Sequence, residues 1–300
     1  MTMAPMDIRY TDRQKGTVVE ITVVGKDRKG VVADITNFIF RNRGNIEQIS
    51  QNVVHGLFGM QLKASFQKKI QRKELNNGLR SLSGKLQMEI KVHFQEPNRI
   101  KNLAILVSKE EHCLLAILNS EKKNLIKANI AAIIGTDDTL KPLADNARIP
   151  FFTVNNTDQV EAESHILRLI ELHNVDLIIL ARYMRILTPN FVWRYPNRII
   201  NIHPSLLPAF PGAYAYIQAY ERGAKIVGCT AHFVTEDLDQ GPIICQESFK
   251  VLESDTIDTI KKKGQELEGV TLSEALKLYL EERLEVYWGR VHIIKKPNNT

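Results

Sequence analysis

The chain has 300 residues, of which 44% are hydrophobic and 25% charged, and this is the composition of an ordinary soluble globular protein. No apolar run approaches the roughly 18 residues that a membrane span needs, and the N-terminus lacks the basic-then-apolar form of a secretory signal. The formal net charge of +6 comes from scattered basic residues without interleaved aromatics. This pattern argues against nucleic acid and suits a small anionic substrate.

The length favours two domains, and the first is predicted over residues 17–95. Its predicted elements are, in chain order, a strand at 17–25, a helix at 31–43, strands at 46–54 and 58–66, a helix at 73–85 and a strand at 88–94. The order βαββαβ predicts a ferredoxin-like unit. The polar, proline-bearing stretch 95–100 is typical of a linker.

The second domain is predicted over residues 101–300, where strands and helices alternate. The predicted elements are strands at 102–108, 129–135, 149–154, 175–181, 198–204, 225–234 and 242–251, and helices at 113–119, 138–148, 160–173, 188–195 and 215–223. Apolar strands that alternate with helices predict a mostly parallel, Rossmann-like sheet covered on both faces. Residues 255–288 are predicted to be mostly amphipathic helix.

The stretch "NIHPSLLPAFPG" (201–212) ends a predicted strand on the polar residues Asn201 and His203. Side chains two apart on a strand point to the same side, and ligands bind beyond the carboxyl ends of parallel strands. An amide and an imidazole there could polarise a carbonyl and stabilise the oxyanion formed on attack. The prolines that follow would limit the freedom of the loop. The plainer interpretation is a capped strand end and a satisfied, partly buried histidine.

The loop "TEDLDQG" (235–241) follows the next predicted strand and is acidic. Such loops are usually only solvated, but a carboxylate delivered to His203 could act as a general base or hold the imidazole protonated. Gly241 would allow a sharp turn. His232, on the same strand face as Thr230, is interpreted as a structural, hydrogen-bonded histidine.

The three cysteines, Cys113, Cys229 and Cys245, have no CxxC or Cys/His ligand spacing. They are expected to be reduced structural thiols of a cytoplasmic protein, with no metal site.

Three long motifs, "NIHPSLLPAFPG", "GCTAHFVTEDLDQGPII" and "ARYMRIL", together resemble the formyltetrahydrofolate transferases and hydrolases. The N-terminal unit, with "DRKG" and "RGNI", resembles an ACT domain, a small-molecule-sensing module. Within the larger group, this two-domain layout is similar to that of the formyltetrahydrofolate deformylases.

The resemblance implies a catalytic trio of Asn201, His203 and Asp239. It also implies a folate pocket formed by two segments, with substrate-binding residues Met184, Arg185, Ile186 and Leu187 from the first and Val234, Thr235, Glu236 and Leu238 from the second. The implied reaction converts 10-formyltetrahydrofolate and water into tetrahydrofolate and formate, with the folate as substrate and no separate cofactor.

For the ACT-like unit, the resemblance implies an amino-acid effector such as glycine or methionine, near the turn that opens the first helix. The candidate effector-binding residues are Asp27, Lys29, Gly30 and Asn45, because a helix N-terminus offers free N–H groups to a carboxylate. The resemblance also implies a homo-oligomer. The alternative is a purely structural dimerisation module.

One departure bears on the reaction. Deformylases often carry a second histidine after "NIH", where this chain has Pro204. "NIHPS" and Arg185 fit glycinamide ribonucleotide transformylases, whereas "ARY" fits deformylases. Formyl transfer to glycinamide ribonucleotide is therefore the alternative activity. A non-catalytic regulator that retains the fold is a further alternative, although the whole trio is present.

The turn after the first strand of the second domain favours hydrolysis. A ribonucleotide acceptor needs its phosphate held where glycines and a helix N-terminus expose backbone N–H groups. Here the strand is followed by "KEEHCLLAIL", which contains no glycine and places Glu110 and Glu111 in the turn. Two carboxylates there would repel a phosphate dianion, with Lys109 the one compensating charge.

Overall fold

A computed structural model describes residues 17–66, 71–94, 96, 99–155 and 157–295. The chain divides into two compact units, residues 1–96 and 97–300, and each is described here by itself. Residues 95, 97 and 98 of the predicted linker lie outside the described residues. Among the described residues, no helix is both long and apolar enough to cross a bilayer.

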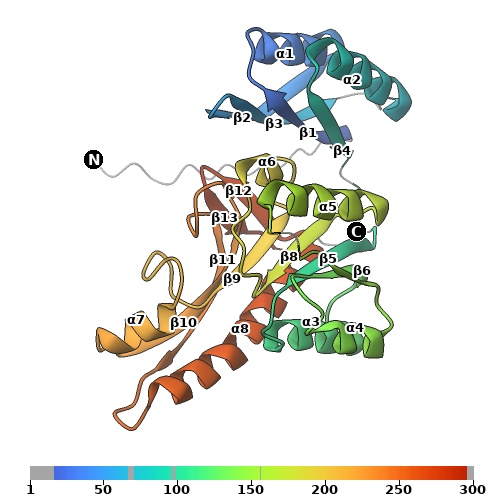
Figure 1. The fold of residues 1–300 in the computed structure, drawn as a ribbon. Coiled ribbons are helices and arrows are strands. Elements are labelled where there is room, and N and C mark those ends of the chain that lie inside the picture. Colours follow the sequence, from blue (N-terminus) through green and yellow to red (C-terminus); the bar gives the residue numbers. More distant parts are fainter. Residues whose placement is uncertain (1–16, 67–70, 95, 97–98, 156, 296–300) are drawn as a thin grey trace, which may run out of the picture. The chain divides into compact units, whose positions relative to one another are not determined.

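The first unit is a four-stranded antiparallel sheet in the order β2-β3-β1-β4 with two helices (Figure 1). Its elements are β1 (Thr17–Lys26), α1 (Val31–Arg41), β2 (Gly44–Val54), β3 (Leu57–Phe66), α2 (Arg72–Leu86) and β4 (Glu89–Phe94). Alternate β1 residues and every fourth α1 residue are buried in one core, for example Ile21, Val23, Ile35 and Ile39. The predicted ferredoxin-like βαββαβ order is confirmed.

The second unit is built on a seven-stranded sheet in the order β11-β10-β9-β8-β5-β6-β7. Its strands are β5 (Lys101–Val107), β6 (Ala128–Gly135), β7 (Phe151–Thr153), β8 (Leu177–Ala181), β9 (Ile199–His203), β10 (Ile226–Phe233) and β11 (Ile243–Lys250). β5 to β9 pair in parallel, and β10 runs antiparallel to both of its neighbours. The mostly parallel sheet of the prediction is therefore observed, with an antiparallel edge.

Helices cover both faces of this sheet, as Figure 1 shows. They are α3 (His112–Lys122), α4 (Lys141–Ala147), α5 (Gln159–Leu172), α6 (Pro189–Val192), α7 (Ala215–Glu221) and α8 (Ile257–Leu280). One core cluster joins the sheet to α3, α4 and α8, and a second joins the opposite face to α5 and α6. The parallel strands are buried on both sides because these two layers enclose them.

The C-terminal segment differs from the prediction of a mostly helical stretch over 255–288. The helix α8 ends at Leu280, and a hairpin follows, made of β12 (Leu284–Tyr287) and β13 (Arg290–Ile293). Trp288 and Gly289 form its two-residue turn with positive φ angles of 48° and 71°. A two-residue turn of this hand matches the twist of paired strands, so the aromatic and β-branched residues on either side form a ribbon rather than a helix.

Candidate active site

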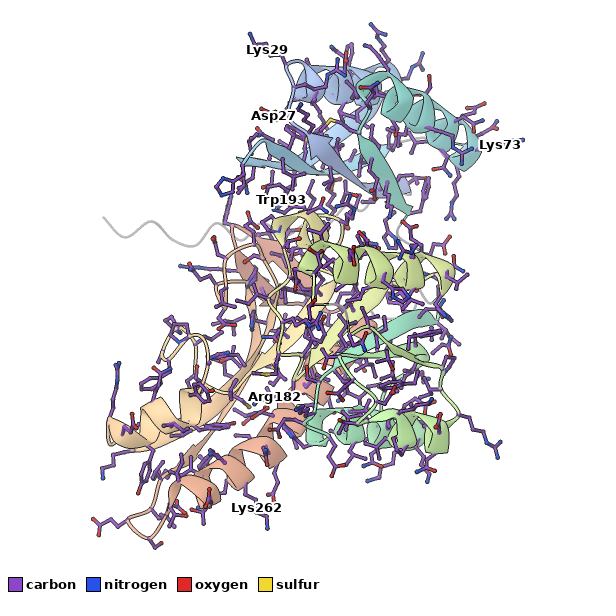
Figure 2. The ribbon with its side chains drawn as sticks, viewed as in Figure 1. Asp27, Lys29, Lys73, Arg182, Trp193 and Lys262 are labelled. Carbon is purple, nitrogen blue, oxygen red and sulfur yellow. The ribbon has the colours of Figure 1, made fainter. Side chains whose placement is uncertain are left out.

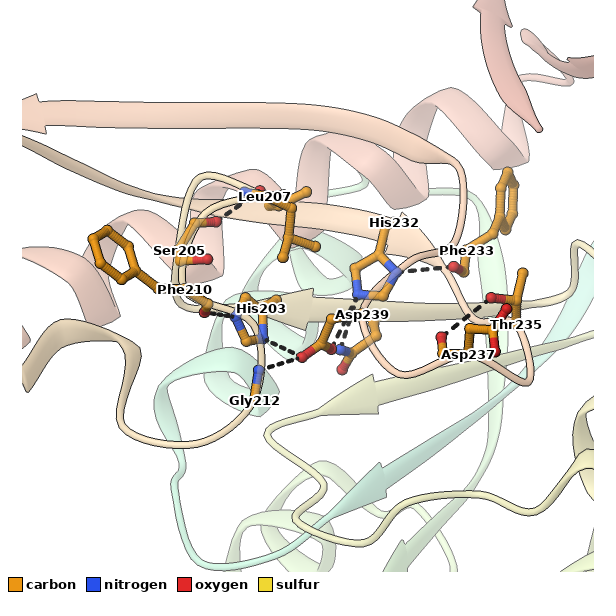
Figure 3. A network of polar contacts seen from close by, with 12 residues as sticks. His203, Ser205, Leu207, Phe210, Gly212, His232, Phe233, Thr235, Asp237 and Asp239 are labelled. Carbon is orange, nitrogen blue, oxygen red and sulfur yellow. Dashed lines mark hydrogen bonds and ion pairs between the residues drawn. The ribbon is translucent and has the colours of Figure 1, made fainter. Parts of the chain in front are cut away.

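The candidate site is built on two neighbouring strands, β9 and β10. Their register places Thr230 opposite His203 and His232 opposite Asn201. Residues directly opposite in a pair share a face of the sheet, so these four polar side chains form one patch. Figure 3 shows two of them, His203 and His232. The structure thus brings the predicted pair Asn201 and His203 together, and it adds two residues from β10.

His203 is buried, with 4% of its surface exposed. Its Nε2 lies 2.9 Å from the carbonyl oxygen of Phe210, and its Nδ1 lies 3.3 Å from Oδ2 of Asp239. Both ring nitrogens therefore face oxygen acceptors. An imidazolium, which carries N–H on both nitrogens, satisfies both of these acceptors.

Asp239 reaches the strand patch from the loop after β10. Its Oδ2 accepts a hydrogen bond from the backbone N of Gly212 at 2.8 Å and also faces His203. Its Oδ1 lies 3.9 Å from Nε2 of His232, which is too long for a hydrogen bond. The side chain is only 6% exposed. The third member of the predicted trio is thus in direct contact with the second.

His232 holds the amide of Asn201. Its Nδ1 lies 2.9 Å from the carbonyl oxygen of Phe233, and its Nε2 lies 3.2 Å from Nδ2 of Asn201. Burial lowers the pKa of His232, which outweighs the opposing effects of the Phe233 carbonyl and of Asp239. The ring is therefore neutral near pH 7, donates from Nδ1 and accepts at Nε2. The NH₂ group of Asn201 must then face His232, and its second N–H remains available to a substrate.

The interpretation of His232 as merely structural is incomplete. The residue is hydrogen-bonded as expected, but it contacts two of the three predicted catalytic residues. A signal for this existed in the sequence: His232 and Thr230 alternate on the strand that precedes the acidic loop. It could be used only if β10 was known to pair with β9 in the observed register.

The loop between β9 and α7 is anchored to β10 and β11 by side chains. Thr230 donates to the carbonyl of Ser205 at 2.7 Å and accepts from the backbone N of Leu207 at 3.0 Å. Gln246 donates to the carbonyl of Leu207 at 2.9 Å. These bonds hold the loop segment that supplies the Phe210 carbonyl and the Gly212 N–H to the site (Figure 3).

Gly241 lies at the bend that closes the acidic loop, as predicted, and close packing of the backbone also requires a glycine there. A Cβ at this position would lie 1.7 Å from the carbonyl oxygen of Phe233, and its φ is not among the positive angles. The requirement is close approach of two backbone segments. Within this loop, Asp239 itself has a positive φ of 55°, and Asp is among the residues that tolerate the left-handed region.

The predicted folate-binding residues lie on two segments. In the first, after β8, Met184 and Ile186 are exposed (63% and 65%), Arg185 is half-buried and Leu187 is buried. In the second, after β10, Val234 packs against the core cluster that contains Leu187. The remaining residues of that segment are partly or largely exposed: Thr235, Glu236 and Leu238. Exposed side chains in both segments suit a binding surface.

The predicted effector residues do not form a single cluster within one chain. Asp27, Lys29 and Gly30 are exposed at the β1–α1 turn (Figure 2), where Gly30 has a φ of 88°. Asn45 pairs with Ser65, which in turn pairs with Val18, so it lies near the opposite end of the sheet. Val18 lies eight residues before Lys26, where β1 ends at the turn. At about 3.3 Å per strand residue, Asn45 is therefore roughly 26 Å from the turn. A small ligand at the turn cannot reach Asn45 of the same chain.

Sequence reasoning missed a second buried polar cluster, centred on Glu268 of α8. Glu268 has no exposed surface; its carboxylate accepts from the hydroxyl of Tyr216 at 2.8 Å and lies 3.0 Å from Nε2 of His112. Nε of Arg182, which Figure 2 labels beside α8, is 3.7 Å away. Burial, followed by the charge of Glu268, raises the pKa of Tyr216 beyond its usual range, so the phenol remains a donor. The cluster joins α3, α7, α8 and the carboxyl end of β8.

Among the described residues, His112, Cys113 and Glu268 also lie close enough together to hold a metal ion. A hydroxyl, an imidazole and a guanidinium already surround the carboxylate, while Nε of Arg182 is buried without a hydrogen-bond partner among the described residues. Burial raises the pKa of the Cys113 thiol, which disfavours the thiolate that metals bind. All three cysteines are free.

Comparison with known proteins relates both units to described families. A formyl transferase model matches residues 101–276, and an ACT domain model matches residues 17–93. A formyltetrahydrofolate deformylase of Synechocystis sp. is 39% identical over 269 residues, which are 88% of this chain and 94% of the relative.

Two solved structures differ in how much of this chain they match. A formyltetrahydrofolate deformylase of Pseudomonas syringae pv. tomato, 29% identical, aligns with a TM-score of 0.65 over 94% of this chain and 96% of that chain. A glycinamide ribonucleotide transformylase of Symbiobacterium toebii, 35% identical, aligns with a TM-score of 0.63 over 97% of that chain but only 68% of this one.

Proposed function

The chain belongs to the formyltetrahydrofolate deformylase family of hydrolases, and on that premise we propose that it hydrolyses 10-formyltetrahydrofolate to tetrahydrofolate and formate. The observation that supports this most is the joint placement of Asn201, His203 and Asp239 around one strand patch. The proposed reaction needs only the folate and water, so we propose no separate cofactor.

Asn201 is proposed to bind the formyl oxygen. Neutral His232 takes one N–H of the Asn201 amide, which directs the other N–H outward as a fixed donor. A donor that is already oriented costs no reorganisation when negative charge develops on that oxygen. His232 is thus a positioning residue for Asn201.

Asp239 is proposed to transfer a proton, and His203 is proposed to stabilise the negative charge of the intermediate. The water oxygen attacks the formyl carbon while Asp239 accepts a proton from the water, and the imidazolium of His203, shifting from the Phe210 carbonyl, stabilises the oxyanion. The C–N10 bond then breaks, and N10 receives the proton that Asp239 took from the water. The formyl carbon leaves as formic acid, which releases its proton to give formate. The 3.3 Å contact between His203 and Asp239 supports coupled roles for these two residues.

Formyl transfer to glycinamide ribonucleotide is the alternative, and the turn after β5 weighs against it. Gln265 of α8 donates to Glu110 in this turn at 2.8 Å, and His112 at its end is tied to Glu268. The turn therefore carries carboxylates, which repel a phosphate dianion, and α8 already contacts it.

The decisive experiment is incubation of the protein with 10-formyltetrahydrofolate, with and without glycinamide ribonucleotide. We expect formate at the same rate in both. Formylated ribonucleotide as the main product, with little formate, would replace hydrolysis by transfer. No formate and no formylated product would favour a non-catalytic regulator.

For the first unit we propose a small amino-acid effector, glycine or methionine, bound at the β1–α1 turn. The support is the ACT family match and the exposed turn with its helix N-terminus. We also propose a homo-oligomer, which light scattering would test, and a cytoplasmic location, because free cysteines fit a reducing compartment.

A further inference from the structure

The segment after β8 that is proposed to bind folate, residues 184–187, exposes two of its four side chains. Met184 and Ile186 are largely exposed, and Leu187 is the one side chain of residues 184–187 that is buried in the core. A segment with exposed side chains keeps one conformation for a ligand only if its backbone is held from elsewhere in the fold.

Three backbone groups of residues 184–188 are hydrogen-bonded to side chains from outside this stretch. The N–H of Met184 donates to Oγ of Ser108, at the end of β5, at 3.1 Å. The carbonyl of Ile186 accepts from Nε2 of Gln159 at 2.9 Å. The N–H of Thr188 donates to Oε1 of Glu163 at 2.7 Å. Two of the three anchors therefore come from α5.

Glu163 is the centre of this arrangement. It is only 3% exposed. Its Oε1 also accepts from Nε2 of Gln159 at 2.8 Å, and its Oε2 accepts from the hydroxyl of Thr188. A buried carboxylate is costly unless both oxygens are hydrogen-bonded, and here both are. Through Gln159, one turn earlier on the same helix, Glu163 also orients the donor that holds Ile186.

We propose that Glu163 is a positioning residue for substrate binding, which fixes the backbone of residues 184–188 in the conformation that receives the folate ring. The inference rests on the proposed function, because it concerns the same substrate. It adds that affinity for the ring is set from α5, by residues that do not touch the ligand, while the chemistry is set separately on β9 and β10.

The test is steady-state hydrolysis of 10-formyltetrahydrofolate by Glu163→Gln, Gln159→Leu and Thr188→Val. Glu163→Gln replaces one acceptor oxygen by an NH₂ group, Gln159→Leu removes an amide that donates twice, and Thr188→Val removes one hydroxyl, each at similar size. The expected result is a KM about tenfold higher, because a buried group loses its hydrogen-bond partner, with kcat within about twofold, because the strand patch is untouched. Backbone amide exchange at residues 184–188 should become faster in all three variants. Glu161→Gln, an exposed substitution on the same helix, is the matched control and should leave KM unchanged.

Thr188→Ser keeps the hydroxyl and should restore the wild-type KM. This comparison with Thr188→Val remains informative if Glu163→Gln does not fold. A lower melting temperature with unchanged KM and unchanged exchange at 184–188 would show that Glu163 is only structural and would overturn the inference. A wild-type protein that forms no formate would instead contradict the proposed function, and binding of tetrahydrofolate to the same variants would still test the positioning.

Discussion

Asp239 is the proposed catalytic residue whose carboxylate is held by both the β9–α7 loop and His203. Oδ2 is held by the Gly212 N–H and faces His203. Asp239→Asn should therefore lower kcat by roughly 100- to 1,000-fold, the size seen when one charge-stabilising group is lost, while KM changes little. Initial-rate kinetics measure this. Asp237→Asn, exposed in the same loop, is the control, and an Asp239→Asn enzyme of near-native rate would remove this residue from the mechanism.

His232 couples the stability of the fold to pH. Burial lowers its pKa below the ordinary 6.5, so the folded protein resists a proton that the unfolded chain accepts. Stability should then be complete above about pH 6.5 and fall as the pH decreases below it. His232→Gln should flatten part of this acid-side decline in melting temperature between pH 8 and pH 5. His292→Gln, on the exposed C-terminal hairpin, should keep the wild-type slope; equal slopes in all three proteins would contradict the assignment.

Among single residues, the sequence predicts Asn201 and His203 well, because side chains two apart on a strand point to the same side. It predicts the contact with Asp239 only through family resemblance. Glu163 and Glu268 could not be anticipated, since a glutamate inside an amphipathic helix pattern looks like a solvated residue. Only the packing of α5 and α8 shows that these two are buried.

The loop between β10 and β11 is the element on which the geometry of Asp239 depends. Gly241→Ala would place a Cβ 1.7 Å from the Phe233 carbonyl, and a backbone atom cannot move aside cheaply. We expect a loss of about 1–3 kcal/mol in unfolding free energy and a lower kcat, measured by thermal unfolding and initial rates. Gly84→Ala in α2, where a Cβ meets open space, should instead be neutral or stabilising by up to about 1 kcal/mol. A Gly241→Ala enzyme of unchanged stability and rate would refute the close-approach argument.

Elements with strong periodicity were predictable, and those that depend on pairing were not. The buried strand 175–181 has one explanation, a central parallel strand, and β8 is that strand. The C-terminal hairpin was missed because its Trp288–Gly289 turn lacks the usual Asn-Gly signature. The antiparallel register of β10, which brings His232 to the site, is a property of two strands together and has no local signal in either.

The two units of the molecule have separate cores, so a signal from the first unit to the second can be tested as a ligand effect. Glycine or methionine should shift the melting temperature and change the hydrolysis rate. Asp27→Ala should weaken this response, whereas Asn45→Ala, near the far end of the same sheet, should retain it. No effect of either amino acid on melting or rate would leave the first unit a structural dimerisation module.

The C-terminal hairpin carries at its tip one of the two tryptophans of the chain. The two tryptophans differ in exposure to solvent, so their fluorescence can be separated. Trp288 is 94% exposed, whereas Trp193 is partly buried and follows α6, which Thr188 opens. An ionic quencher in solution therefore extinguishes the red-shifted emission of Trp288 first. The emission that remains reports on Trp193, five residues beyond the anchored segment, so a folate titration in the presence of iodide tests the proposed binding surface without any attached label.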